Sequence, residues 1–104
     1  MGKKDDIEKL TNLMCVALRH RIGSIVNQDE LYSPKYAKDA DSILKEAEKV
    51  VVKQNWNDHD KKIIREKLRK KLKKELIDKD FLDDKKFGIM DREIERALEE
   101  FDLV

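Results

Sequence analysis

The sequence contains little of what disulfide-rich, membrane-spanning or loop-rich proteins depend on. Its 104 residues include one cysteine, one proline and three glycines, and only 6% of them are aromatic. Because the lone Cys15 has no second cysteine to pair with, an intramolecular disulfide is excluded and a reducing, cytoplasmic setting is favoured. The apolar neighbours of Cys15 predict that its thiol is buried. No apolar run approaches the roughly 20 residues that a membrane-spanning helix needs, so we expect no membrane contact.

Motifs for phosphate, metal or cofactor chemistry are also missing. The three glycines, Gly2, Gly23 and Gly88, stand alone, so the sequence offers no glycine-rich loop that would hold a phosphate. One cysteine and two histidines, His20 and His59, give none of the spacings that are typical of metal ligands. We therefore expect no metal, no cofactor and no enzymatic activity.

Charged residues, by contrast, are abundant and unevenly distributed. They make up 45% of the chain. A highly charged surface around a small aliphatic core is common in thermophile proteins. The net charge is only +1, but Lys61–Lys74 contains nine Lys or Arg and one Glu, which gives a local charge of +8. Residues 75–104 contain eleven acids and five bases, a charge of −6. This segregation favours ion pairs within the fold or contact with a charged partner.

Apolar residues recur at steps of three and four along most of the chain, which predicts helices. We expect four of them in one domain of residues 1–104, at about residues 6–26, 34–53, 58–78 and 91–102. No strand-like alternation of useful length is present. The predicted fold class is therefore all-α, a small four-helix bundle-like domain in which the first two helices pack antiparallel.

Local signals indicate where the second and third helices begin. Ser33 suits the capping position and Pro34 the first helical position of the second helix. Either Asn57 or Asp58 is expected to cap the third helix. Trp56, directly before that cap, is expected to close the end of the core.

The segment before the fourth helix is predicted to be a polar loop. Two apolar clusters within it, Phe81-Leu82 and Phe87-Gly88-Ile89, are expected to anchor the loop to the core. Asp91 is expected to cap the fourth helix. The acidic residues of that helix are Glu93, Glu95, Glu99 and Glu100.

The most distinctive feature is the basic surface of the third predicted helix. Its apolar stripe, with residues four apart, consists of Ile64, Leu68, Leu72 and Leu76. The candidate contact residues on the remaining surface are Lys61, Lys62, Arg65, Arg69, Lys70, Lys73 and Lys74. Three interpretations are open: the cations bind phosphates of DNA or RNA, they contact a protein, or they pair with the acids of the fourth helix. No aromatic residue is interleaved with them for base stacking.

His20 lies between two arginines on the polar side of the first predicted helix. A ribonuclease-like toxin with Arg19 and His20 at its site would need a second histidine, a carboxylate or a nucleophile within hydrogen-bond reach. His59 is the only other histidine, and no fixed spacing links the two. The alternative is that Arg19 and His20 are surface or partner-contact residues.

Two stretches resemble the helical region at the C-terminal end of the R subunit, the motor and endonuclease subunit, of type I restriction-modification enzymes. The first is ALRHRI at residues 17–22, followed by an acidic loop and Tyr36, and it is similar to the family's helix that ends in A-[IL]-R-H-x-I. The second is Trp56 followed by residues 64–76, which is similar to the family's W…R-x-K-[LMI]-R-x-x-[VL]-K-[RK]-x-L run.

This resemblance implies a docking role. The helicase motifs and the metal-dependent nuclease core of that family are absent, so the chain would be a detached C-terminal domain without activity of its own. Its partners would be the methyltransferase and specificity subunits of a restriction-modification complex. The matching positions Arg19, His20, Arg65 and Arg69 would lie at the contacts.

Overall fold

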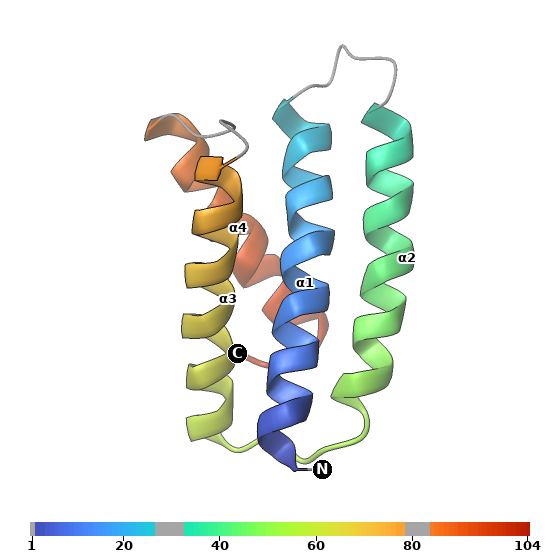
Figure 1. Ribbon diagram of the computed structural model, residues 1–104, viewed down its shortest axis with the longest axis vertical. Coiled ribbons are helices and arrows are strands. Elements are labelled where there is room, and N and C mark those ends of the chain that lie inside the picture. Colours follow the sequence, from blue (N-terminus) through green and yellow to red (C-terminus); the bar gives the residue numbers. More distant parts are fainter. Residues whose placement is uncertain (1, 27–32, 79–83) are drawn as a thin grey trace.

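The computed structural model describes residues 2–26, 33–78 and 84–104, and within these ranges the chain forms helices and no strand. The four helices are α1 (Lys3–Val26), α2 (Ser33–Val51), α3 (Asp58–Asp78) and α4 (Asp84–Glu100). In Figure 1, α1 lies between α2 and α3, and α4 crosses behind α1 and α3. The predicted all-α class is confirmed.

Helix α1 is the centre of the molecule. It packs against each of the other helices, whereas the backbone of α2 approaches only that of α1 among the described residues. The predicted antiparallel packing of α1 and α2 is confirmed, since the start of α1 meets the end of α2, where Gln54 Nε2 donates to Asp6 Oδ2 at 2.6 Å. Near the other end of α1, Arg21 lies 3.8 Å from Asp41 of α2.

The core consists of aliphatic residues at helical spacing. Helix α1 contributes Ile7, Leu10, Met14, Leu18 and Ile22 to the core. Helix α3 contributes its predicted apolar stripe, Ile64, Leu68, Leu72 and Leu76. The buried residues of α2 are Ala40, Leu44, Ala47 and Val50. The two small alanines in this set allow the backbones of α1 and α2 to approach closely.

The start of α3 is fixed by a reciprocal cap. The backbone N–H of Asp60 donates to Asn57 Oδ1 at 2.8 Å, and the N–H of Asn57 donates to Asp60 Oδ2 at 3.2 Å. Each residue thereby satisfies one backbone donor that the helix leaves unpaired. Trp56 packs half-buried against the core, as predicted, and its indole N–H donates to the Val51 carbonyl at 2.8 Å.

The prediction for the start of α4 is wrong. The helix begins at Asp84 rather than Asp91, and it includes Gly88 and Ile89, which were expected to lie in a loop. Asp91 is an exposed residue inside the helix and does not cap it. Met90, which is 1% exposed, extends the apolar stripe of α4 toward its start, so packing on the core outweighs the poor helix propensity of Gly88. Phe81-Leu82 lies outside the described residues.

Candidate functional site

Each side of the basic helix α3 meets a different environment. Its apolar stripe faces the core, one flank faces α1, the other flank faces α4, and α3 forms one edge of the molecule in Figure 1. Residues three and four apart share a face, so the cations of α3 are sorted among these environments by their position in the sequence.

On the flank toward α4, two arginines are held by acids of that helix. Arg65 forms a salt bridge and a hydrogen bond with Glu95, and Arg69 Nε lies 3.3 Å from Asp91 Oδ1. The interpretation that the basic helix pairs with the acidic fourth helix therefore holds for Glu95. It does not hold for Glu93, whose carboxylate is buried and turned away from α3.

On the flank toward α1, Glu8 lies between two lysines of α3. Its carboxylate accepts hydrogen bonds from Lys71 at 2.5 Å and from Lys67 at 3.1 Å. Both bonds lower the pKa of the Glu8 carboxyl, and the bond from Lys71 has the larger effect. Lys71 also donates to Asn12 Oδ1 at 2.5 Å. Sequence reasoning missed Glu8, because nothing local to α1 reveals a partner 59 residues further along the chain.

The outward face of α3 keeps its cations exposed. We define the lysine row as Lys62, Lys70, Lys73 and Lys74, all of which are exposed. Lys62, Lys70 and Lys74 form no ion pair with any described residue. At about 100° per residue, the row covers about a third of the helix circumference, and Glu66 is the only acid of α3 within this arc.

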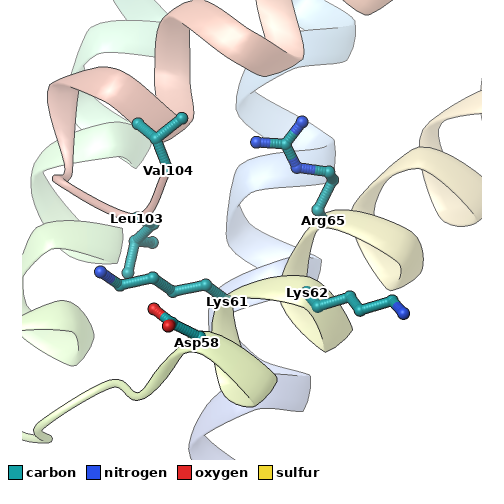
Figure 2. Close-up of a pocket in the computed structure, with 6 residues that line it drawn as sticks. All are labelled: Asp58, Lys61, Lys62, Arg65, Leu103 and Val104. Carbon is teal, nitrogen blue, oxygen red and sulfur yellow. The ribbon is translucent and has the colours of Figure 1, made fainter.

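At the start of α3, two adjacent lysines diverge. Lys61, Lys62 and Arg65 line a shallow pocket of about 230 Å³ together with Asp58, Leu103 and Val104. In Figure 2, Lys61 and Lys62 extend to opposite sides of the helix. Lys61 is only half-exposed, so we leave it out of the lysine row.

Arg19 and His20 do not form a site with the second histidine. Arg19 Nη1 donates to Glu75 Oε2 of α3 at 3.2 Å, and the Nδ1–H of the half-buried His20 donates to the Val16 carbonyl at 2.8 Å. His59 lies in the first turn of α3, where its neighbour Asp60 is 2.6 Å from Lys3. His20 is seventeen residues beyond Lys3, a distance of about 25 Å along α1, so the two histidines lie near opposite ends of that helix.

Cys15 is buried, as predicted. The residue is 5% exposed, and the pKa of its thiol is raised to about 11, first by burial and then by the nearby carboxylate of Glu75. A thiol with so high a pKa is almost entirely protonated at neutral pH and is a poor nucleophile.

The structure also contains a buried ionic cluster that sequence reasoning missed. Arg21 Nη1 lies 3.5 Å from Glu93 Oε2 and 3.9 Å from Glu100 Oε1, and neither Arg21 Nη1 nor Glu93 Oε2 has a hydrogen-bond partner among the described residues. Arg21 lines a cleft of about 480 Å³ between α1, α2 and α4. One sequence signal was available, since Glu93 is three residues after Met90 and four before Ala97, on the buried face of α4.

Within the part of the chain that the structure describes, no group of His, Cys, Asp or Glu side chains is arranged to hold a metal ion. None of the helices in these ranges combines the length and the apolar character that crossing a bilayer requires. Comparison with protein-family models, with curated proteins and with solved structures finds no match to this chain.

Proposed function

We propose that this chain is a non-catalytic helical interaction domain, and that it binds an anionic partner through the outward face of α3. The lysine row carries this proposal. Its members are exposed on one face of a helix that is itself fixed by core packing, so the backbone that carries the charges is ordered before a partner arrives. Preorganised charge lowers the entropy that binding costs.

The sorting of cations on α3 explains why the outward face would serve as the contact. The flanking cations are already engaged by acids within the fold, by Glu8 on one side and by Glu95 and Asp91 on the other. The lysine row and Glu66 together carry a charge of +3, from four lysines and one acid. A partner surface of the opposite sign would bind faster and in a defined orientation.

The resemblance to the R subunit would make the partner a methyltransferase or specificity subunit. Three of the four positions that this resemblance assigns to contacts, Arg19, Arg65 and Arg69, are engaged by acids of the chain itself. Docking through them would first require these ion pairs to break. If the partner is such a subunit, we infer that the lysine row makes the contact instead.

Cation-exchange chromatography with two charge-matched variants tests the proposed contact surface. One variant replaces the lysine row with glutamine, and the control replaces Lys35, Lys38, Lys45 and Lys53 with glutamine. All four control lysines are exposed and lie in or directly after α2. Removing four positive charges takes the net charge of both variants from +1 to −3.

We expect the control to be retained on the resin and the lysine-row variant to flow through, because only the control keeps a clustered cationic face. Equal retention of the two variants would show that the row is not a distinct anion-binding surface. Far-UV circular dichroism of both variants would establish that the helices remain folded.

A further inference from the structure

We propose that the lysine row binds the phosphate backbone of double-stranded nucleic acid without reading its sequence. This inference rests on the proposed function, because it names the partner of the same surface. An acidic protein surface is the competing occupant, and the composition, geometry and electrostatics of the row favour phosphates.

The composition of the row suits phosphates better than a protein. The cores of protein–protein interfaces are depleted in lysine and enriched in aromatic residues and arginine. The lysine row contains none of the enriched types, and Arg65 and Arg69 beside it are held by α4. Ile77, at the end of the same helix, is the one large hydrophobic residue of α3 that is exposed. Contacts to phosphate need only correctly spaced positive charges, which lysine supplies.

The length of the row matches a run of phosphates. From Lys62 to Lys74 the helix advances twelve residues, about 18 Å. A duplex carries one negative charge per about 1.7 Å of its axis, so the row faces a length of duplex with about ten phosphates. Because the four lysines lie within one third of the helix surface, they can approach separate phosphates at the same time.

The acids on the flanks of α3 are paired with flanking cations and add no net negative charge beside the row. Glu8 is neutralised by Lys67 and Lys71, and Glu95 is neutralised by Arg65. The flanks of α3 are therefore close to neutral or positive. The remaining repulsion comes from Glu66, which lies on the outward face between Lys62 and Lys70 and is an exposed acid without an ion pair among the described residues.

The same face lacks the amide side chains that read adenine and the large aromatic rings that stack on bases. Helix α3 contains no asparagine, glutamine, phenylalanine, tyrosine or tryptophan. Bidentate contacts to adenine use Asn or Gln, and binding of single strands relies on stacking against aromatic rings. The row is therefore expected to bind duplexes of different sequence equally, and single strands no more tightly than duplexes.

Fluorescence anisotropy with three labelled probes tests this inference. The probes are a 24-base-pair DNA duplex, one of its single strands, and poly-L-glutamate, titrated with the whole chain at salt concentrations from 50 to 200 mM. With four phosphate contacts, the slope of log affinity against log salt for the duplex is expected to be about −3.6. The affinity should then fall about a hundredfold across this range.

Two kinds of variant extend the test: one should lose duplex binding, and the other should strengthen its dependence on salt. Glutamine in place of the lysine row should abolish duplex binding, whereas the charge-matched α2 control should keep the slope of the native chain. Glu66→Lys adds a fifth cation to the face and should steepen the slope by about 0.9, while Glu48→Lys on α2 should not. The gain in Glu66→Lys cannot be produced by misfolding.

The outcomes separate the two proposals. Binding of poly-L-glutamate through the lysine row, without binding of the duplex, would overturn the nucleic-acid inference and leave the interaction domain intact. Failure of all three probes to bind at 50 mM salt would overturn both. A clear preference for the single strand or for one duplex sequence would contradict binding through the backbone alone.

Discussion

Burial raises the pKa of the Cys15 thiol, and the nearby carboxylate of Glu75 in α3 raises it further, to about 11. At pH 8 the folded chain should then contain about a hundredfold less thiolate at this position than a chain with an ordinary thiol pKa. We expect native Cys15 to react with a disulfide reagent at least a hundredfold more slowly than the chain unfolded in guanidinium.

A double variant, Cys15→Ser with Ser42→Cys, provides the control for this reactivity. Ser42 is exposed on α2, so a cysteine there should react at the rate of the unfolded chain. Rapid labelling of native Cys15 would contradict its burial between the helices.

Glu93 is the residue whose truncation should cost most among the acids of α4. Glu93→Ala removes the buried partner of Arg21, whose side chain is only 14% exposed, and is expected to lower the free energy of unfolding by about 2 kcal/mol. Urea denaturation measures this change. Glu99→Ala, at an exposed position of the same helix, should change the free energy of unfolding by less than about 0.5 kcal/mol.

A second variant separates a lost ion pair from a lost packing contact. Arg21→Met combined with Glu93→Leu removes both charges and keeps the apolar volume, so it should be more stable than Glu93→Ala alone. If the double variant were instead less stable than Glu93→Ala, the buried Arg21–Glu93 pair itself would stabilise the fold.

At the scale of residues, sequence reasoning succeeds where the signal is local. The burial of Cys15 follows from its apolar neighbours, and the cap at Asn57 follows from its position before a periodic segment. The pairing of Arg21 with Glu93 joins residues 72 positions apart, and no local pattern encodes it. No local pattern reveals the pairing of Glu8 with α3 either. The sequence alone therefore could not show which cations of α3 are paired within the fold.

At the scale of elements, the start of α4 is the main disagreement between the sequence-based prediction and the structure. The sequence-based prediction places Phe87-Gly88-Ile89 in a polar loop as a short apolar cluster. The packing of Met90 on the core holds the helix in place over this stretch, and such tertiary contacts are not visible in local propensity.

Gly88→Ala tests whether residue 88 lies in a helix. A β-carbon built at this exposed glycine has no neighbour within 4 Å, so alanine fits without strain. We expect the free energy of unfolding to rise by about 0.5–1 kcal/mol, because alanine loses less backbone entropy in a helix. No gain in urea denaturation would indicate that residue 88 belongs to a loop.

The end of α4 offers a second substitution that should stabilise the protein. The N–H of Leu103 donates to the Leu98 carbonyl at 2.8 Å and the N–H of Asp102 to the Glu99 carbonyl at 3.1 Å, which is a Schellman motif. Asp102 has φ 56°, a conformation that glycine adopts at no steric cost.

We expect Asp102→Gly to stabilise the chain by about 0.5 kcal/mol in thermal or urea unfolding, since relief of the strained φ exceeds the entropy that glycine loses. Asp102→Ala should be less stable than Asp102→Gly by about 1 kcal/mol. If the alanine variant were the more stable of the two, the left-handed conformation at residue 102 would be contradicted.

At the scale of the whole molecule, the number of helices and the antiparallel packing of the first two followed from the sequence, but the central position of α1 did not. A periodic apolar stripe shows which face of a helix is buried and not which neighbour buries it. The apolar face of α1 is wide enough to meet three helices, whereas the alanine-rich face of α2 meets only α1.

Glu8 and Asp60 are two of the carboxylates that connect α1 with α3, and both give the stability of the fold an acid dependence. Hydrogen bonds from Lys71 and Lys67 lower the pKa of Glu8, and a hydrogen bond from Lys3, followed by one from the Asn57 N–H, lowers the pKa of Asp60. Because these pKa values are lower in the folded chain, the unfolded chain takes up protons first as the pH falls.

The stabilisation from these two groups is therefore complete at neutral pH and is lost as the pH falls below about 5, through the lowered pKa values. Urea denaturation at pH 7, 5, 4 and 3 measures the loss. The double variant Glu8→Gln, Asp60→Asn should be less stable than the native chain at pH 7 and should lose less stability on acidification, because its amides do not titrate. Curves that fall in parallel would mean that carboxylates other than Glu8 and Asp60 govern the acid response of the fold.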